Sequence, residues 1–154
     1  MPRFSSSLTG EEVADYLEAQ RTGVLATIGR DGFPHQMAMW YIPEPGRILM
    51  WTYRRSQKAV NLRRDPRASF FIQDGKTYET LRGVLIRGAA ELVEDTATVL
   101  ELGLRLRRRY YPTADLSSSR QFVARQAPKR MIICLPITDV ASWDHRKIPA
   151  SDKS

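Results

Sequence analysis

A short segment rich in hydroxyl and basic side chains is the clearest candidate for a chemical site. Thr52 stands four residues before Ser56, and Lys58 follows two residues after Ser56. Ser56 is a good helix N-cap, so Lys58 falls in the first turn of the helix expected to begin after it. Unpaired backbone N–H groups and the helix dipole attract phosphate to such a terminus, and a lysine adds a full charge. The spacing indicates a phosphate-binding cradle, with a solvated basic helical turn as the alternative.

Side chains able to catalyse a reaction by themselves are sparse. His35 and His145 are far apart in the chain, and no spacing brings them together with a carboxylate as a metal site requires. The single cysteine, Cys134, can form neither an internal disulfide nor a zinc site, and its apolar neighbours predict burial. We therefore expect no metal, assign no catalytic residue, and expect redox chemistry only from a bound cofactor.

Composition and charge are those of an ordinary single-domain protein. Its 154 residues suit one domain, and hydrophobic residues make up 42% of them. The formal net charge of +7 comes mostly from arginine, which suits an anionic ligand, nucleic acid or an anionic surface. No apolar stretch approaches the ~20 residues of a membrane span. Residues 1–7 contain no secretory signal pattern, so a cytoplasmic protein without a membrane partner is expected.

A second basic segment supports a competing class of function. Residues 105–111 combine four arginines with two tyrosines, a composition found in nucleic-acid-binding surfaces. On a helix, however, Leu102 and Leu106 would face the core while the arginines spread over the solvated surface. A solvated helix explains the segment better, so no nucleic-acid partner is expected.

The elements that must position the cradle are mostly short strands. Apolar periodicity and turn residues predict helices over about residues 10–19, 57–64, 96–110 and 119–126. They predict strands over about residues 23–28, 35–42, 47–53, 68–73, 78–93 and 130–142. Helix caps are expected at Thr9, Ser56 and Asp95, and Gly32 is expected to close the first hairpin.

These elements favour a mainly β protein with short helices. Six mostly antiparallel strands, with helices at the ends, are typical of a small β-barrel. Gly83 and Gly88 lie inside the longest strand and are expected to form bulges or bends. The domain is expected to cover residues 1–148, with a disordered tail at residues 149–154.

Six sequence segments in a fixed order carry a family resemblance. They are Gly-Val-Leu-Ala-Thr at 23–27, Asp-Gly-x-Pro-His at 31–35, Thr52-x-x-x-Ser56-x-Lys58, Asn-Leu-Arg-Arg-Asp-Pro-Arg-Ala-Ser at 61–69, a Gly-x-x-x-x-Gly-x-Ala-Glu run at 83–91, and Trp-Asp-His-Arg-Lys at 143–147. Together they resemble the pyridoxamine 5′-phosphate oxidase-like family, and most of all its flavin/deazaflavin oxidoreductase branch. The resemblance implies a split β-barrel, six-stranded and Greek-key-like, that forms a homodimer. It also implies that FMN or coenzyme F420 binds between the subunits.

The resemblance further implies roles for particular residues. One strand would lay its backbone along the tricyclic ring of the cofactor; its residues are Gln36, Met37, Ala38 and Met39. The cradle would hold the phosphate; its residues are Thr52, Ser56, Gln57 and Lys58, and Trp51 is expected to bind the cofactor beside them. Trp143, with Lys147 or Arg146, would reach the cofactor from the partner subunit.

Two positions depart from true pyridoxamine phosphate oxidases. Gln36 and Tyr41 stand where those enzymes carry basic residues, so oxidation of pyridoxamine phosphate itself is not expected. Arginines beside the cradle could instead hold the carboxylate-rich tail of F420; they are Arg54, Arg55, Arg63 and Arg64. F420 is therefore favoured, with FMN as the alternative, because FMN ends at its phosphate and would leave these arginines unused.

The expected reaction is hydride transfer between the cofactor and a small unsaturated or conjugated molecule. The hydride itself needs no side chain, and water, Tyr41 or His35 could donate a proton to the reduced substrate. Four aromatic residues could form a platform for the substrate or pack in the core or interface: Trp40, Tyr41, Trp51 and Trp143. A non-redox barrel that sequesters haem, with His35 or His145 as axial ligand, is a further alternative.

Overall fold

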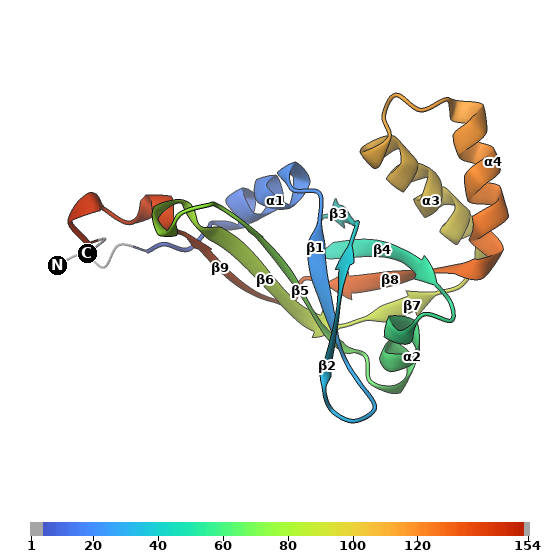
Figure 1. Ribbon diagram of the computed structural model, residues 1–154, viewed down its shortest axis with the longest axis horizontal. Helices are drawn as coiled ribbons and strands as arrows, with labels where there is room; N and C mark the ends of the chain where they lie inside the picture. The colour runs from blue at the N-terminus through green and yellow to red at the C-terminus, as the bar shows by residue number, and fades with distance from the viewer. Residues whose placement is uncertain (1–4, 153–154) are drawn as a thin grey trace.

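Two antiparallel sheets form the body of the protein, and helices pack against them (Figure 1). The structure is a computed structural model and describes residues 5–152. The five-stranded sheet has the order β2-β1-β5-β6-β9, with bounds Pro34–Met39, Gly23–Ile28, Arg67–Asp74, Arg82–Ala89 and Asp139–Asp144. The four-stranded sheet has the order β3-β4-β8-β7, with bounds Ile42–Glu44, Arg47–Tyr53, Arg130–Pro136 and Glu91–Val93.

Three of the four predicted helices begin at the capping residues that the sequence predicts. The helices are α1 (Gly10–Ala19), α2 (Gln57–Arg64), α3 (Thr96–Tyr110) and α4 (Leu116–Gln126). The fourth, α4, begins three residues before its predicted start, after the cap Asp115. Thr9, Ser56 and Asp95 each accept a hydrogen bond from a backbone N–H in the first turn of their helix. Short 3-10 turns cover Tyr78–Thr80, Ala127–Lys129, His145–Lys147 and Ala150–Asp152. The last of these turns lies in the tail expected to be disordered, whose residues 153–154 lie outside the described residues.

The six expected strands correspond to nine strands in the described part of the chain. Three of them divide: residues 35–42 form β2 and β3, residues 78–93 contain β6 and β7, and residues 130–142 contain β8 and the start of β9. In each case one half joins the five-stranded sheet and the other joins the four-stranded sheet. Strands that bend from one sheet into another form the corners of packed sheets. The mainly β, antiparallel class is confirmed, and a closed six-stranded barrel stays a prediction.

Of the bulges or bends expected at Gly83 and Gly88, the bulges are absent. Both glycines lie in regular register with β5 inside β6. A Cβ at position 83 would lie 2.5 Å from Cζ2 of Trp143, and one at position 88 would lie 2.8 Å from the carbonyl oxygen of Pro136. Close approach of neighbouring atoms, not a bulge, therefore requires glycine at both positions.

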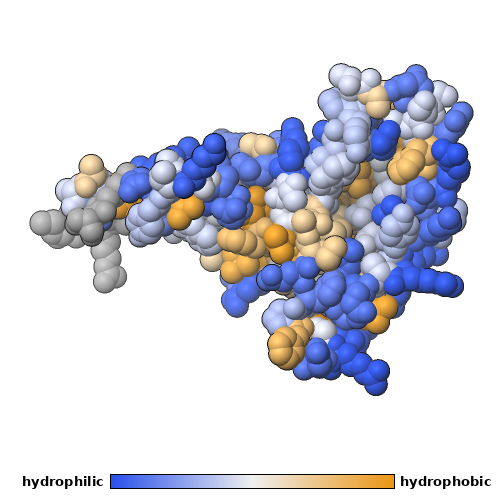
Figure 2. All heavy atoms as spheres, in the orientation of Figure 1, coloured by the Kyte–Doolittle hydropathy of each residue, from blue (hydrophilic) through white to orange (hydrophobic). Residues whose placement is uncertain are grey.

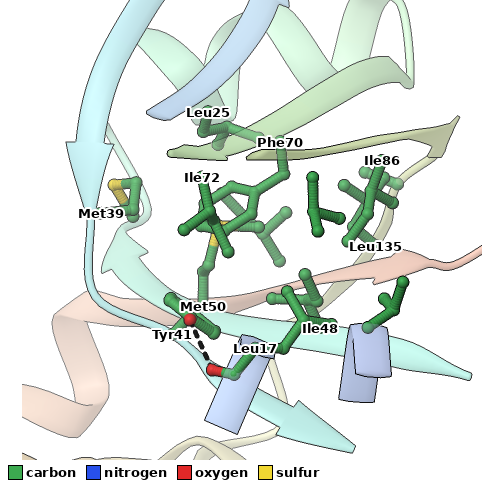
Figure 3. Packing of buried hydrophobic residues seen from close by; sticks show 14 of the residues in the cluster. Leu17, Leu25, Met39, Tyr41, Ile48, Met50, Phe70, Ile72, Ile86 and Leu135 are labelled. Atoms are coloured by element: carbon green, nitrogen blue, oxygen red, sulfur yellow. Dashed lines mark hydrogen bonds between the residues drawn. The ribbon is translucent and has the colours of Figure 1, made fainter. Parts of the chain in front are cut away.

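The main core fills the space between the two sheets (Figure 3). Its largest fully buried side chains include Leu25, Tyr41, Ile48, Met50, Phe70, Ile72, Ile86, Ile133 and Leu135. The ring of Tyr41 meets Phe70 edge to face, with centroids 5.2 Å apart. Its hydroxyl donates a hydrogen bond to the carbonyl oxygen of Leu17 at 2.6 Å, which ties α1 to the core.

A second, smaller core lies between α3 and the four-stranded sheet. Its members are Ile42, Leu49, Val99, Leu102, Leu106, Ala127, Ile132 and Cys134. Leu102 and Leu106 pack inward as their helical spacing predicts. The burial predicted for Cys134 is confirmed, since the residue is only 5% exposed, and burial raises the pKa of its thiol.

Candidate functional site

The end of β4 and the start of α2 bring Thr52 and Ser56 together. The Thr52 side chain is buried, and its Oγ1 lies 3.2 Å from Oγ of Ser56. Ser56 Oγ also accepts a hydrogen bond from the Ala59 N–H at 3.3 Å, which fixes the first turn of α2. The spacing that suggested a cradle therefore corresponds to a real local structure: a capped helix N-terminus with two hydroxyl groups beside it.

Two cations without an opposing carboxylate lie at this helix terminus. Lys58 is half-buried, and within residues 5–152 it forms no ion pair. Burial lowers the pKa of its ammonium group, and the positive charge of Arg130 lowers it further. The Arg130 guanidinium stacks on the rings of Tyr53 and Trp51, at 3.5 and 4.7 Å. Its buried Nε has no hydrogen-bond partner among the described residues. A bound anion would offset the repulsion between Lys58 and Arg130 and could accept a hydrogen bond from this Nε.

Sequence reasoning missed Arg130. It reaches the cradle because β8 pairs with β4 in a register that sets Arg130 opposite Tyr53. The only signal in the sequence is a basic residue at the start of a predicted strand. That signal becomes informative only once the pairing of two distant strands is known.

A buried asparagine attaches α2 to the five-stranded sheet. Asn61 is fully buried, and its Nδ2 donates to Oγ1 of Thr27 in β1 at 3.0 Å. Its Oδ1 accepts from Nε2 of Gln57 at 2.8 Å and from the guanidinium of Arg64. Asn61 therefore sets the position of α2 and orients Gln57, one of the predicted cradle residues.

The edge of β2 offers free backbone groups beside the cradle. β2 is the edge strand of its sheet and pairs only with β1 (Figure 1). The hairpin closes with Gly32 at φ +85° and with the Gly29 N–H donating to the Phe33 carbonyl at 2.8 Å, as the sequence predicts. Because hydrogen-bonded pairs alternate along such a ladder, the N–H and C=O groups of Gln36 and Ala38 point away from β1.

The other two residues predicted on this strand point their backbone inward. The same alternation directs the N–H and C=O groups of Met37 and Met39 toward β1. The Met39 side chain is buried in the main core, whereas that of Met37 is 45% exposed. Only alternate residues of the predicted four can therefore offer backbone groups to a ligand.

A pocket adjoins each end of β2. His35, Gln57 and Asn61 line the first, and the buried Nδ1 of His35 has no hydrogen-bond partner among the described residues. Ala38 and Arg130 line the second, which has a volume of about 360 Å³. The cradle lies between the two pockets, so a long ligand along the open edge of β2 could extend into either.

Three of the four arginines expected to form a basic groove are bonded within the fold. The Arg54 guanidinium donates to the carbonyl oxygens of Arg130 and Glu94. Arg63 pairs with the Glu94 carboxylate at 2.7 Å, and Arg64 donates to the carbonyl oxygen of Ile28. Arg55 is exposed and has no such bond among the described residues.

Trp143 and Lys147 do not lie at the cradle of their own chain. Trp143 is in β9, at the opposite edge of the five-stranded sheet from β2, and stacks on Phe71 with centroids 5.8 Å apart. The Lys147 ammonium pairs with the carboxylate of Glu12 and donates to a backbone carbonyl. Both residues could contribute to the cradle only from a second copy of the chain.

The basic run at residues 105–111 is not a free cationic face. Arg105 pairs with Glu44 at 2.7 Å. Arg109 pairs with Glu18 and donates to carbonyl oxygens at the end of α1. Arg107 lines the pocket beside Ala38, and of the four arginines Arg108 alone is exposed. Leu102 and Leu106 face the core as expected, but three of the four arginines are paired within the fold or line a pocket and are not spread over a solvated surface.

Tyr41 does not fit the role of proton donor considered for it. Tyr41 is fully buried, burial raises the pKa of its phenol, and its hydroxyl is already bonded to the end of α1. It is therefore a structural residue, not a proton donor to a substrate. His145 packs on Tyr78 and has its Nδ1 2.7 Å from the Tyr78 carbonyl oxygen, near the Lys147 end of the molecule.

Replacing Tyr41 by phenylalanine tests this structural role. We expect a loss of about 1–2 kcal/mol in the free energy of unfolding, because the carbonyl of Leu17 loses a buried partner. Chemical denaturation measures the loss. The control is Tyr78→Phe, since Tyr78 is 61% exposed, and it should change stability by less than about 0.5 kcal/mol. Equal effects of the two substitutions would contradict the assignment.

The fold and the site together describe a mainly β protein with a basic cradle beside an open strand edge. The chain belongs to the pyridoxamine 5′-phosphate oxidase family, whose model matches residues 9–144. It is 42% identical to a conserved hypothetical protein from Mycobacterium tuberculosis, with a TM-score of 0.85, over 96% of this chain and 92% of that one. It is 25% identical to a protein described as an F420 reductase, with a TM-score of 0.65, over 87% and 98% of the two chains. The haem storage protein of Vibrio cholerae is 15% identical, with a TM-score of 0.66 over 87% and 94%, and shares the fold.

Two structural features are absent from residues 5–152. No helix there is long and apolar enough to cross a membrane. No group of three or more His, Cys, Asp or Glu side chains there is arranged to hold a metal ion.

Proposed function

We propose that this protein is a cytoplasmic oxidoreductase that uses coenzyme F420, with FMN as the alternative cofactor. The observation that carries the proposal is the pair of cations at the capped N-terminus of α2. Lys58 and Arg130 repel one another, and neither has a carboxylate partner among the described residues. Either cofactor would bring a phosphate group to this position.

The chain's own residues would bind and orient such a cofactor. Lys58 and Arg130 would pair with the phosphate, and the hydroxyl groups of Thr52 and Ser56 would border it. The free N–H and C=O groups at the edge of β2 have the alternation of donors and acceptors that the pyrimidine edge of a flavin-type ring can match. A bound cofactor of this kind supplies the hydride for a small unsaturated or conjugated substrate. The protein would hold the reacting partners together and exclude water.

Two observations bear on the choice of cofactor, and they point in opposite directions. The 25% identity to a protein described as an F420 reductase favours F420. The internal bonds of Arg54, Arg63 and Arg64 favour FMN, because they occupy the arginines expected to hold a carboxylate-rich tail. We retain F420 as the first choice because Arg55 is exposed beside the cradle and because the F420 reductase aligns over most of both chains.

Paired titrations of the purified protein with F420 and with FMN test the proposal. Trp51 lies against Arg130, so quenching of tryptophan fluorescence should report occupation of the cradle. Tight binding of F420 with weak binding of FMN supports a deazaflavin enzyme. The reverse result makes the protein a flavin enzyme, and failure to bind either cofactor contradicts the proposal.

We further propose that the protein is a homodimer with the cofactor between its subunits. The outer face of the five-stranded sheet carries a row of apolar residues in register, Val24, Phe71 and Leu85, none of them fully buried. Figure 2 shows apolar atoms gathered near the middle of one face, between hydrophilic regions. A partner covering such a surface could bring its own Trp143 to the cradle. Light scattering of the purified protein measures the mass that decides between monomer and dimer.

The lowered pKa of Lys58 predicts a pH dependence of cofactor binding. Its ammonium loses the proton at a lower pH than an ordinary lysine, so affinity for the phosphate should fall as pH rises through that lowered value. A bound phosphate stabilises the charged form of Lys58, so binding should take up protons at pH values above the lowered pKa of the free protein. Over the same pH values the Kd should rise by up to about tenfold per pH unit. Calorimetry in buffers of different ionisation enthalpy measures the uptake. Lys58→Arg should abolish it, because guanidinium stays charged; a slope that persists in this variant would contradict the assignment.

A further inference from the structure

The pocket at the Met39 end of β2 has aromatic walls that are fixed in place. Trp51 donates its indole N–H to the Val99 carbonyl at 3.0 Å. α3 can approach the indole because residue 103 is glycine; a Cβ there would lie 2.9 Å from Cζ2 of Trp51. Trp40 stacks on Tyr110 with centroids 4.3 Å apart and planes 8° apart. The walls are therefore rigid flat surfaces, which favour a flat ligand.

The same pocket contains cations and no acidic side chain. Arg107 and Arg130 both line it, and none of the lining residues is Asp or Glu. The Arg107 guanidinium stacks on Tyr111 at 4.3 Å and on Phe122 at 5.1 Å. Its only hydrogen bond among the described residues is a long one, 3.4 Å, to Oγ of Ser119. A guanidinium packed against two rings retains N–H donors for a carboxylate, which arginine binds in a bidentate geometry.

The pocket also touches the proposed cofactor site. Ala38, whose free backbone groups lie at the open edge of β2, forms part of its lining. Arg130 lines the pocket and also repels Lys58 of the cradle. A molecule in the pocket would therefore lie beside a cofactor ring on β2, where a hydride acceptor or donor must be.

We infer that this pocket binds the substrate, and that the substrate is a small, flat, conjugated molecule with a carboxylate that pairs with Arg107. The inference rests on the proposed function and names the substrate class for the same site. Arg130 serves the cofactor side of the pocket, and Arg107, on α3, serves the substrate side. Aromatic stacking alone would accept neutral molecules equally well, so the carboxylate preference is the feature to test.

The experiment uses naphthoate and its uncharged analogue naphthamide as probes. Calorimetry measures their Kd for the full-length protein, alone and saturated with whichever of F420 or FMN binds. We expect naphthoate to bind about tenfold or more tightly than naphthamide, and Arg107→Gln to remove this preference. Arg108→Gln is the matched control, since Arg108 is the exposed neighbour on the same helix and should keep it. The ratio of the two affinities within one variant does not depend on a general loss of stability.

Each outcome has one meaning for the inference. Equal affinities for naphthoate and naphthamide in the unaltered protein would overturn it, as would a preference that survives Arg107→Gln. Displacement of naphthoate by the cofactor would also overturn it, because the pocket would then belong to the cofactor. Cofactor affinity should stay within about twofold in Arg107→Gln. If neither cofactor binds but the carboxylate preference is present, the proposed function fails while the ligand class of the pocket stands.

Discussion

Replacement of Lys58 by alanine is expected to weaken cofactor binding by roughly 30- to 150-fold without destabilising the free protein. The loss corresponds to about 2–3 kcal/mol for a charge-assisted bond to phosphate in a partly buried site. Stability should be equal or higher, because the substitution removes a half-buried cation that Arg130 repels. Tryptophan quenching measures the Kd, and thermal unfolding of the apo-protein measures the stability.

A loss of affinity without a loss of stability separates a binding role from a structural role. A lysine that supported the fold would lower both affinity and stability when replaced. The control is Lys76→Ala, because Lys76 is an exposed lysine in the turn after β5. We expect no change in Kd or in unfolding temperature for this control. An unchanged affinity in Lys58→Ala would show that the phosphate binds elsewhere.

Local features of the fold are predictable from the sequence because their causes are local. The caps at Thr9, Ser56 and Asp95 each depend on one side chain and the N–H group three residues later. The hairpin turn depends on the positive φ of Gly32. The cradle belongs to this class, since Thr52, Ser56 and Lys58 lie within seven residues of chain. The sequence alone therefore predicts that these residues lie close together, without knowledge of any tertiary contact.

Features that depend on partners from distant segments are not predictable in this way. The bend between β2 and β3 contains neither glycine nor proline to mark it in the sequence. It arises because the chain leaves the five-stranded sheet there and joins the four-stranded sheet. β3 continues past residue 42, the predicted end of the strand, and accommodates Pro43 because it is an edge strand with an unpaired side. Arg130 joins the cradle only through the register of β4 and β8. Three of the four arginines beside the cradle have internal partners that no spacing reveals.

Replacement of Asn61 by alanine should be the most destabilising of the substitutions considered, at about 2–4 kcal/mol. Asn61 is fully buried and bonds to Thr27, Gln57 and Arg64, so its removal leaves several polar groups without partners and opens a cavity. Urea denaturation measures the change in the free energy of unfolding. The control is Val60→Ala on the exposed side of the same helix, which should change stability by less than about 0.5 kcal/mol.

A paired substitution then separates the stability of α2 from its role in positioning the cradle. In the double variant Thr27→Val, Asn61→Leu, both buried partners become apolar, so much of the lost stability should return. Gln57 and Arg64 still lack their acceptor, so the first turn of α2 should remain less well ordered and cofactor affinity should stay reduced by about tenfold. Recovery of affinity together with stability would mean that Asn61 acts only through the fold. Recovery of stability alone would identify it as the residue that holds the cradle in its binding geometry.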